Sequence, residues 1–455
     1  MKPWIAIVLA AGKGTRMKSK FPKVLHKAAG KAMVHHVAGC ALRAGAGKLV
    51  TIVGFGADQV EKVMTELSQI VEQKEQLGTG HAVQQCIPAL AGFAGDVVIL
   101  SGDTPLLRPE TLGGLIADHQ ERNNSATVLT ATLSNPSGYG RIIRRGGQVV
   151  GIVEQKDATD EQKNLNEINT GIYCFKQDKL IEALGTLTND NAQGEYYLTD
   201  TLAYLVEKGE SVGAVILKDP NEALGVNSRE QLAEVEQILR KRKNKELMEA
   251  GVTLMDAAST YIDMEVEIGS DTIIYPGTWI EGKSKIGSDC KIGPNTRLQD
   301  VQIGDEVEMQ FTYAHECQVD DKVIIGPYVH LRPGTHLKAG VKVGNFMEIK
   351  NSVVGEGTKL PHLSYIGDAD LGKEVNIGCG TITVNYDGAK KHRTLVADQA
   401  FVGCNSNLVA PVMVGKGAYI AAGSTITKDV PEGALGVGRA KQSNIEGWVN
   451  RKRNS

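Results

Sequence analysis

Aliphatic residues recur at every sixth position along the C-terminal part of the chain, from about residue 262 onward. One unbroken run consists of Ile268, Ile274, Ile280, Ile286, Ile292 and Leu298. Because 42% of the residues are apolar, six successive hits arise by chance with a probability of roughly 0.5%, and the restriction to Ile and Leu makes chance rarer still. A six-residue repeat with inward aliphatic side chains predicts a parallel β-helix, whose stacked coils share one core.

The repeat continues beyond this run with one slip and one long interruption. After a shift of one residue it resumes at Ile303, and it then passes through Ile325, Leu331, Leu337, Val343 and Ile349, and finally from Val396 to Ile426. Between Thr383 and Leu395 the hexads stop for the polar and positively charged segment VNYDGAKKHRT. Loops that leave a rigid repeat commonly carry binding groups, so we expect a ligand-binding loop here.

The first 227 residues follow a different pattern, in which short apolar runs alternate with helical periodicity. Residues 5–9 (IAIVL), 49–53 (LVTIV) and 97–100 (VVIL) have the composition of buried strands. This alternation predicts an α/β domain with a mainly parallel sheet. Ligands of such sheets bind beyond the carboxyl ends of the strands.

The segment LAAGKGTRM (9–17) directly follows the first predicted strand. Gly12 and Gly14 allow backbone N–H groups to approach phosphate oxygens, and Lys13, Arg16 and Lys23 add positive charge. The segment matches neither G-x-x-x-x-G-K-[ST] nor G-x-G-x-x-G, so the P-loop and the dinucleotide fingerprint do not apply. It predicts a phosphate-binding loop, and a tight structural turn is the alternative.

Asp103 follows the strand at 97–100 and places one carboxylate at a strand end. One carboxylate suffices for Mg²⁺ when substrate phosphates and waters supply most of the coordination, which points to a nucleoside triphosphate substrate. The alternative role of this aspartate is to cap a helix.

A single long helix is predicted at residues 228–250, with Ser228 as its cap and Gly251 at its end. We expect its basic run, Arg240 to Lys243 with Lys245, to form a solvated face. The chain therefore divides into residues 1–227, a helical linker at 228–251, and residues 252–455.

Composition excludes several classes of protein. The net charge of −3 gives no broad basic field for nucleic acid or a membrane surface. Seven cysteines without a C-x-x-C pair fit a reducing cytoplasm better than a disulfide framework, and no run approaches 18 apolar residues. The 52 glycines show no G-X-Y period, which excludes a collagen-like chain. We expect a cytoplasmic protein that binds neither nucleic acid nor a membrane.

Motifs in both halves give the chain a close resemblance to a known family. The N-terminal series is LAAGKGTRM, FPKVLH (21–26), EQLGTGHA (75–82), GYGRI (138–142), VEQKDAT (153–159), NTG (169–171), NAQGEYYLTD (191–200) and GVN (225–227). The C-terminal series is LRPG (331–334), GNFMEIK (344–350), HLSYIGD (362–368), NIGCGTIT (376–383), NYDG (385–388) and GRAKQ (438–442). Together they resemble the bifunctional bacterial enzymes that make UDP-N-acetylglucosamine. The resemblance implies a nucleotidyltransferase domain joined by a long helix to a left-handed β-helix acetyltransferase domain.

For the N-terminal half, the resemblance implies transfer of a uridyl group from UTP to N-acetylglucosamine-1-phosphate with release of pyrophosphate. Arg16 and Lys23 would act at the phosphates, and Asp103 with Asn227 would hold Mg²⁺. The implied nucleotide-sugar site comprises Leu9, Ala10, Ala11, Gly12, Lys23, Gln73, Gly78, Thr79, Gly140, Glu154, Asn169 and Asn227.

For the C-terminal half, the resemblance implies acetyl transfer from acetyl-CoA to glucosamine-1-phosphate, with His362 as the general base. The implied sugar-phosphate site comprises Arg332, Lys350, Tyr365 and Asn376. The implied acetyl-CoA site comprises Cys379, Asn385, Tyr386, Cys404, Ala422 and Arg439. The two cysteines depart from the small residues, alanine and serine, that the family places there.

The sequence argues against two other functions and against a zinc site. A single-activity sugar nucleotidyltransferase with a purely structural β-helix is opposed by NYDG and HLSYIGD, and a regulatory subunit is opposed by the retained Arg16, Lys23, Asp103 and Asn227. Zinc binding by His330 and His336 lacks any supporting H-E-x-x-H or C-x-x-C motif. The resemblance also implies a homotrimer with active sites between subunits.

Overall fold

A computed structural model describes residues 2–453 of the chain. The chain divides into two compact units, Met1–Leu239 and Arg240–Ser455. Each unit has its own hydrophobic core, so the two are described separately. Among the described residues, no helix combines the length and the apolar character needed to cross a membrane.

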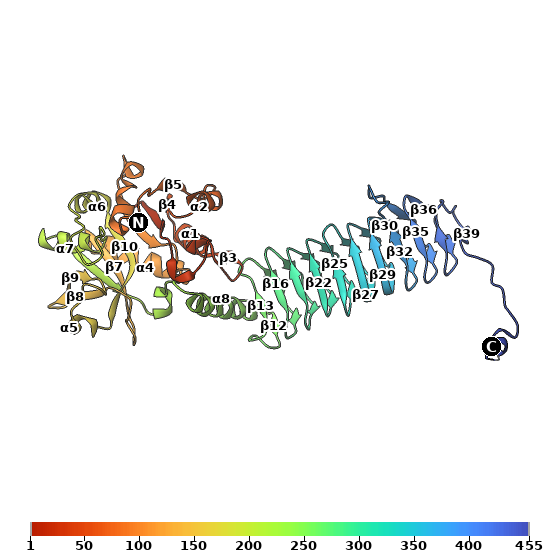
Figure 1. The fold of residues 1–455 in the computed structure, drawn as a ribbon. Coiled ribbons are helices and arrows are strands. Elements are labelled where there is room, and N and C mark those ends of the chain that lie inside the picture. The colour runs from red at the N-terminus through yellow and green to blue at the C-terminus, as the bar shows by residue number, and fades with distance from the viewer. Residues whose placement is uncertain (1, 454–455) are drawn as a thin grey trace. The chain divides into compact units, whose positions relative to one another are not determined.

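The N-terminal unit is built on a twisted sheet with strand order β11-β7-β10-β6-β1-β4-β5, and the strands β8 and β9 form a side hairpin (Figure 1). The strands are β1 (Trp4–Ala10), β4 (Leu49–Val53), β5 (Gln69–Glu72), β6 (Asp96–Ser101), β7 (Ala126–Thr132), β8 (Arg141–Arg145), β9 (Gln148–Val153), β10 (Glu167–Lys176) and β11 (Val212–Ile216). β10 is antiparallel to both of its neighbours, whereas the other main pairings are parallel. The predicted α/β class is confirmed.

Helices cover both faces of this sheet because successive β1 side chains point to opposite sides. Ala6 and Val8 pack in one core, and Ile5 and Ile7 pack in the other. The helices of this unit are α1 (Met33–Arg43), α2 (Ala57–Met64), α3 (Thr79–Gln84), α4 (Pro109–Glu121), α5 (Asp160–Lys163), α6 (Gln177–Leu184) and α7 (Asp200–Glu207). The strand predicted at 49–53 has the observed bounds, and those at 5–9 and 97–100 are each longer in the structure.

The predicted long helix is α8 (Arg229–Glu249). Its basic run is the expected solvated face only in part: Lys241 and Lys245 are exposed, but Arg240 and Lys243 are not. Lys243 is 5% exposed and pairs with Glu246 at 3.1 Å, while the Arg240 guanidinium lies 4.1 Å from the ring centroid of Tyr261. The expectation is wrong for Arg240 and Lys243 because the second half of α8 packs on the first β-helix coils, where Leu247 joins the core.

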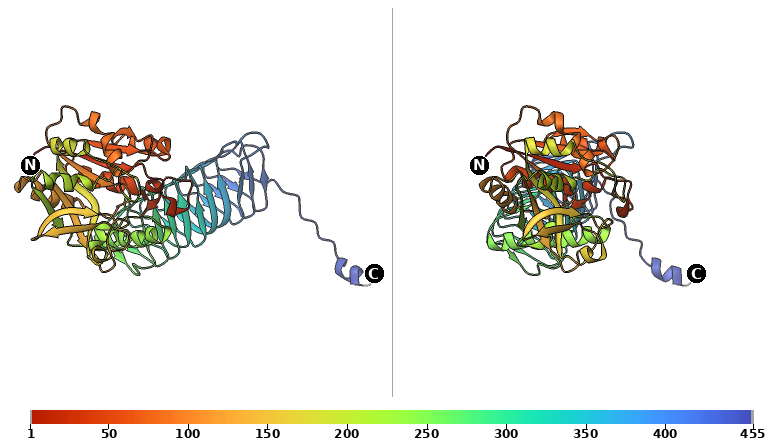
Figure 2. Two further views of the ribbon diagram at one scale, coloured as in Figure 1. Left: turned by 60° about the vertical axis from the view of Figure 1, so that its left-hand side comes forward. Right: turned by 90° about the vertical axis from the view of Figure 1, so that its left-hand side faces the viewer.

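The C-terminal unit is a parallel β-helix, as the hexad repeat predicts (Figures 1 and 2). In many coils corresponding residues lie three hexads apart, so Ile274 pairs with Ile292 and Ile280 with Leu298. The predicted slip shortens some coils, because Ile286 pairs with Ile303. The strands run from β12 (Thr253–Leu254) to β39 (Leu435–Gly436), and a short helix, α9 (Trp448–Arg453), follows them.

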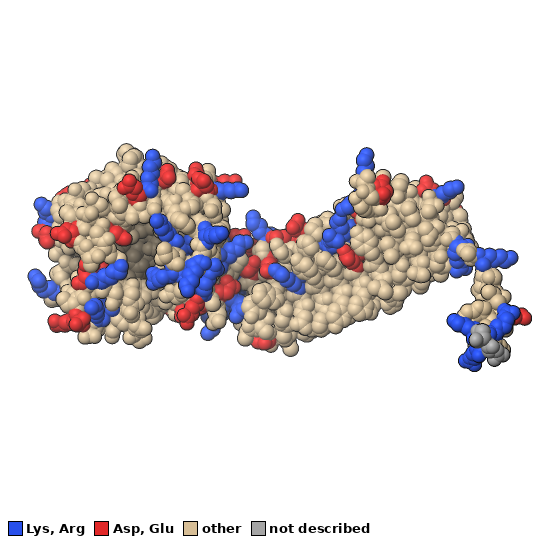
Figure 3. Space-filling model, viewed as in Figure 1, with Lys and Arg blue, Asp and Glu red and all other residues tan. Residues whose placement is uncertain are grey.

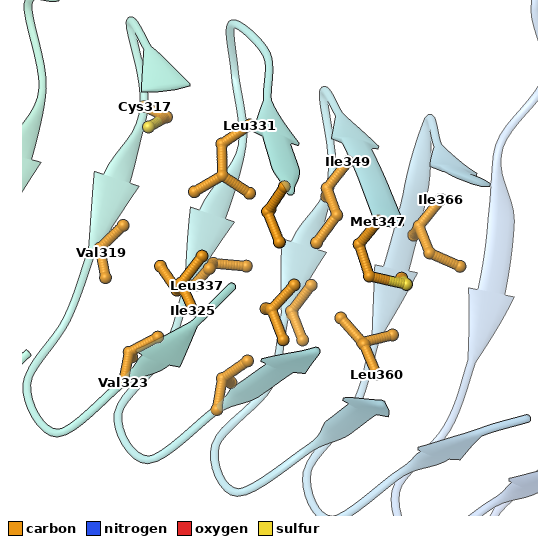
Figure 4. Packing of buried hydrophobic residues seen from close by; sticks show 14 of the residues in the cluster. Cys317, Val319, Val323, Ile325, Leu331, Leu337, Met347, Ile349, Leu360 and Ile366 are labelled. Carbon is orange, nitrogen blue, oxygen red and sulfur yellow. The ribbon is translucent and has the colours of Figure 1, made fainter. Parts of the chain in front are cut away.

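The repeated aliphatic residues fill the interior of the coils. Figure 4 shows Leu331, Ile349 and Ile366 stacked on successive coils, with Ile325 and Leu337 on other sides of the same core. Buried Ser and Thr side chains occupy further inward positions and donate to backbone carbonyl groups, as Thr358 does to Gly372 at 2.8 Å. Sequence reasoning identified the aliphatic positions and missed this polar ladder.

Candidate functional site

The first candidate site lies at the carboxyl ends of the central strands of the N-terminal unit. β1 pairs in parallel with β4 and β6, so Ala10 is opposite Val53 and Leu9 is opposite Ser101. The Gly102 amide donates to the Leu9 carbonyl oxygen at 2.9 Å, which ties the loop after β6 to the end of β1. The loops after these strands therefore meet at one edge of the sheet.

A cavity of about 440 Å³ opens at this edge. Many of the residues predicted to bind the nucleotide line it, namely Leu9, Ala10, Ala11, Gly12, Lys23, Gln73, Gly78, Thr79 and Asp103. Figure 3 shows a hollow in one face of the N-terminal unit with Lys and Arg side chains gathered beside it. The lining includes Lys13 and Lys23, whose ammonium groups can bind a phosphate-bearing ligand, together with the carboxylates of Asp103 and Glu195.

One end of the cavity is built from the loop after β5. Gln73 is buried, and its amide nitrogen donates to the Gly78 carbonyl oxygen at 3.1 Å and contacts His81 Nδ1 at 3.1 Å. Gly78 has φ of +113°, and a Cβ there would lie 2.6 Å from the carbonyl oxygen of Tyr196. Glycine is therefore required for this loop to pack against the 191–200 segment.

Lys23, Asp103 and Asn227 form a cluster around one ammonium group beside the predicted phosphate-binding loop. The Lys23 ammonium forms a short ion pair with Asp103 and donates to Asn227 Oδ1 at 2.9 Å. The Lys23 stem packs on Gly14, where a Cβ would come within 2.6 Å of Lys23 Cβ. The Val226 amide donates to the Asp103 carbonyl oxygen at 2.9 Å and so holds the Asn227 segment in place. Two oxygens of the predicted metal site thus converge on one cation.

The residues predicted for the sugar end also lie together, beyond the lining of the cavity. The Asn169 amide donates to the Gly140 carbonyl oxygen at 2.9 Å, and a Cβ on Gly140 would lie 3.5 Å from Glu154 Oε1. Burial raises the pKa of Glu154, and the nearby Asp157 and Asp200 carboxylates add to this rise. Arg16 is exposed on the short helix η1 (Thr15–Met17) that follows the phosphate loop.

The lining residues that sequence reasoning missed include Gln76 and Glu195. Both belong to motifs that carried the resemblance, EQLGTGHA and NAQGEYYLTD. The motifs were the available signal, and only the packing of these two loops reveals which of their side chains reach the cavity.

The second candidate site runs along one corner of the β-helix. Asn345 of β27 (Lys342–Lys350) pairs with His362 of β29 (Lys359–Gly367). The next coil carries Cys379 at the same position. Lys359 pairs with Asn376 and Tyr365 pairs with Ile382, so the same spacing places Cys379 opposite His362.

The same column continues over two more coils. β31 (Asn376–Ile377) pairs with β34 (Phe401–Val402), and β32 (Ile382–Val384) pairs with β35 (Asn407–Val409) at the same offset, which aligns Cys379 with Cys404. The next coil aligns Cys404 with Ala422. The structure therefore places four predicted acetyltransferase residues in one line, namely His362, Cys379, Cys404 and Ala422.

The His362 imidazole is held by its neighbour in this column. Its Nδ1 lies 3.2 Å from Asn345 Oδ1. A carbonyl oxygen can only accept a hydrogen bond, so this contact places the proton of the neutral imidazole on Nδ1 and leaves the Nε2 lone pair available. An exposed imidazole with a free Nε2 can act as a general base.

A second column carries the predicted phosphate-binding side chains. Leu331 pairs with Ile349, so the following residues, Arg332 and Lys350, are neighbours on adjacent coils. Arg332 pairs with Glu348 at 2.7 Å. The Lys350 ammonium lies against Lys391 of the excursion and lowers the pKa of Lys391. Two adjacent ammonium groups favour a bound anion.

The excursion loop is fastened to the coils by amide side chains. Asn385 donates to the Tyr365 hydroxyl at 3.4 Å and to the Asp368 carboxylate. Burial alone would raise the pKa of Asp368, but the hydrogen bonds from Asn351 and Asn385 outweigh it and lower the pKa. Tyr386 lies beyond this anchor and is exposed.

The other predicted residues of this half lie apart from these contacts. Asn376 pairs with Lys359 of the preceding coil and with Phe401 of the following coil. Arg439 donates to the Ala422 carbonyl oxygen at 2.6 Å. An open groove of about 610 Å³ includes Tyr365 among its lining residues.

The two histidines considered for zinc lie on different sheets. His330 stacks on Tyr313 with ring centroids 5.1 Å apart, whereas His336 Nε2 contacts Asp320 at 2.8 Å. Within residues 2–453 no group of three or more His, Cys, Asp or Glu side chains is placed to hold a metal ion. The structure therefore adds no support for a zinc site.

Sequence reasoning missed Asn345, Glu348, Asp368 and Lys391, each of which contacts a predicted residue. Asn345 and Glu348 lie in GNFMEIK, and Lys391 lies in the excursion whose charge was noted. Asn345 pairs with His362 across a coil of 17 residues, one short of three hexads, so the hexad count alone would not have aligned the two side chains.

Comparisons with known proteins cover the whole chain. Residues 6–254 match the family model of the MobA-like NTP transferase domain. The chain is 52% identical over 454 residues to the Bifunctional protein GlmU of Geobacillus sp. (strain WCH70), with 99% of each chain covered. It is 50% identical over 450 residues to the protein of that name from Halalkalibacterium halodurans, again with 99% of each chain covered. The corresponding Clostridium perfringens protein is 52% identical over 449 residues, which span 98% of this chain and 99% of that protein.

Proposed function

The chain belongs to the family of bifunctional GlmU proteins, and on that premise we propose that its two units perform successive steps of UDP-N-acetylglucosamine synthesis. The C-terminal unit transfers an acetyl group from acetyl-CoA to glucosamine-1-phosphate. The N-terminal unit then transfers a uridyl group from UTP to the product. Both co-substrates belong to the cytoplasm, where we place the reaction.

Uridyl transfer uses the cavity at the strand ends. The sugar phosphate attacks the α-phosphorus of UTP, and the bond to pyrophosphate breaks. The loop from Leu9 to Gly12 holds the nucleotide, with Gln73 and Gly78 at the base and Glu154 with Asn169 at the sugar. Arg16 and Lys23 offset the phosphate charge, so catalysis rests on positioning and electrostatic stabilisation.

Asp103 and Asn227 have the oxygen donors that Mg²⁺ requires. Their convergence on the Lys23 ammonium supports this fit, because the same two oxygens already share a cation. When bound, Mg²⁺ would neutralise charge on the triphosphate. Lys23 must leave the two oxygens for a metal ion to bind there, and its flexible stem then allows it to reach the phosphates.

This arrangement predicts that Lys23→Met tightens metal binding in the absence of nucleotide while it lowers uridyl transfer. Removal of the competing ammonium should lower the Kd for Mn²⁺ roughly tenfold, which corresponds to ~1.4 kcal/mol. Electron paramagnetic resonance of free Mn²⁺ measures this affinity without any turnover. Lys13→Met, which changes another lysine of the cavity, is the matched control and should leave the Kd unchanged. Equal affinity of wild type and Lys23→Met would contradict the competition.

Acetyl transfer uses the corner of the β-helix. His362 Nε2 takes a proton from the sugar amine as the amine attacks the thioester carbonyl, and the carbon–sulfur bond to CoA breaks. Arg332 and Lys350 bind the sugar phosphate, and Lys391 adds a third cation. Tyr365 and Asn376 orient the sugar, while the path of CoA passes Cys379, Asn385, Tyr386, Cys404, Ala422 and Arg439.

The observation that carries the second activity is the alignment of His362 with the proposed CoA residues on successive coils. A β-helix that served only as a scaffold would not need an imidazole held by an amide side chain, or a cluster of cations on the same coils. This arrangement favours the bifunctional enzyme over a single-activity nucleotidyltransferase.

Exposed apolar side chains on the β-helix support self-association, and the number of subunits we propose is the three that the resemblance implies. Tyr328, Phe346 and Leu363, which lie on adjacent coils beside the groove, are each more than half exposed. Contiguous apolar surface of this kind marks interaction sites, and a second copy of the chain would cover it. Sedimentation equilibrium of the full chain, with an expected mass of three subunits, tests the assembly.

A two-part assay tests the proposed function. One reaction contains the protein, acetyl-CoA and glucosamine-1-phosphate, and the other contains the protein, UTP, Mg²⁺ and N-acetylglucosamine-1-phosphate. We expect release of CoA in the first and of pyrophosphate in the second. Activity in the second alone would establish the single-activity alternative, and activity in neither would favour a regulatory subunit.

A further inference from the structure

Two of the seven cysteines differ from the others in their surroundings. Five are buried, and burial raises the pKa of Cys40, Cys86 and Cys317 to about 12. Cys379 is partly exposed and Cys404 is exposed. Thiol chemistry in solution is therefore directed to these two residues, because reaction requires access and a thiolate.

Cys379 and Cys404 occupy equivalent positions in consecutive coils. Each follows an inward aliphatic residue and a glycine, in the sequences NIGCGT and FVGCNS. The next residue is left-handed in both turns, with φ of +76° at Gly380 and +58° at Asn405. Because the two turns share this conformation, the cysteine side chains leave the backbone in the same direction.

Close packing of the two turns brings the thiols within reach of each other. The Asn405 amide donates to the Cys379 carbonyl oxygen at 2.6 Å, and a Cβ on Gly378 would lie 2.5 Å from the Cys404 nitrogen. Adjacent strands of a sheet lie ~4.8 Å apart. Paired disulfides have Cα atoms ~4.4–6.8 Å apart, so residues facing each other across this spacing can be bridged with a small shift.

We propose that Cys379 and Cys404 form a reversible disulfide that switches off acetyl transfer while uridyl transfer continues. The effect on activity rests on the proposed function, since the pair lies in the column that carries His362 and Ala422. The bridge would reshape the surface on which the thioester of acetyl-CoA has to lie. Exposed bridges with some strain are easily reduced, which suits a switch.

The oxidant is a low-molecular-weight disulfide, RSSR. CoA disulfide is one example, and its CoA group fits the proposed acetyl-CoA site that contains the two cysteines. The Cys404 thiolate attacks one sulfur of RSSR, the sulfur–sulfur bond breaks, and RS⁻ leaves and takes a proton. The Cys379 thiolate then attacks the Cys404 sulfur and displaces the second RS⁻. One RSSR is consumed, two RSH are released, and the two protein thiols are oxidised to one disulfide.

The test treats the full-length protein separately with glutathione disulfide and with CoA disulfide. Mass spectrometry of non-reduced peptides should identify a Cys379–Cys404 crosslink, and the intact chain should be two hydrogen atoms lighter. Acetyl transfer should fall about 10²-fold, since a misplacement of ~1 Å at a reacting centre can cost that much. Uridyl transfer should stay constant, and dithiothreitol should restore acetyl transfer.

Variants assign the response to this pair. For each variant, the rate of acetyl transfer after oxidation is divided by the rate of the same variant in its reduced state. Cys379→Ser and Cys404→Ser should each lose the crosslink, whereas Cys317→Ala, which removes a buried thiol of the same β-helix, should keep it. Phenylarsine oxide, which bridges two close thiols, provides a test without mutation and should block crosslinking in wild type.

Absence of the crosslink under both oxidants, or persistence of the inhibition in the double serine variant, would overturn the proposal. Failure of the proposed function is a separate outcome, because reduced protein would then lack acetyl transfer whether or not the crosslink forms. Crosslinking without a change in acetyl transfer would also overturn the switch.

Discussion

Replacement of His362 by alanine should lower the kcat of acetyl transfer by about 10²–10⁴-fold, the usual contribution of a general base. The reason is the loss of the free Nε2 that the contact of Nδ1 with Asn345 leaves unprotonated. Uridyl transfer should not change, because its proposed residues belong to the other compact unit. Rates of CoA release and pyrophosphate release on the same preparation provide the measurement.

His336→Ala is the matched control for this substitution. His336 is also an imidazole of the β-helix, but it contacts Asp320 on a different sheet. It should retain acetyl transfer. Full acetyl transfer by His362→Ala would show that another group takes the proton from the amine.

Asp103→Asn should lower uridyl transfer by about 10²–10³-fold, the cost typical of removing one electrostatic contact to a transition state. Asp103 provides the carboxylate of the proposed metal site and holds Lys23 beside the phosphate loop. Acetyl transfer should stay at the wild-type rate. Asp118→Asn, which changes a carboxylate on α4 paired with Arg122, is the control and should leave both rates intact. Unchanged uridyl transfer in Asp103→Asn would remove this carboxylate from the mechanism.

The β-helix could be predicted from sequence because its rule is local. Each hexad places one aliphatic side chain inward, and Ile292 and Ile349 are buried as the repeat requires. The same rule sets the pairing of coils, because corresponding hexads stack. The burial of Lys243 could not be predicted in this way, since it depends on the packing of α8 against coils that follow it in the chain.

In the candidate sites, too, residues placed by a local rule could be predicted, and residues placed by long-range packing could not. Residues at strand ends, such as Leu9 and Asp103, could be placed beside a ligand because parallel strands end at one edge. Gln76 and Glu195 reach the same cavity from loops that are distant in sequence, and their convergence depends on loop packing. Asn345 was missed because its contact with His362 arises only from coil stacking.

The central claim is that one chain carries two separate active sites that act in sequence, and a mixing experiment tests it most directly. His362→Ala and Asp103→Asn proteins are assayed alone and together with glucosamine-1-phosphate, acetyl-CoA, UTP and Mg²⁺. We predict that neither alone makes UDP-N-acetylglucosamine at a substantial rate, that Asp103→Asn accumulates N-acetylglucosamine-1-phosphate, and that the mixture makes the nucleotide sugar. A mixture as inactive as its components, with no acetylated sugar phosphate formed by Asp103→Asn, would contradict the account.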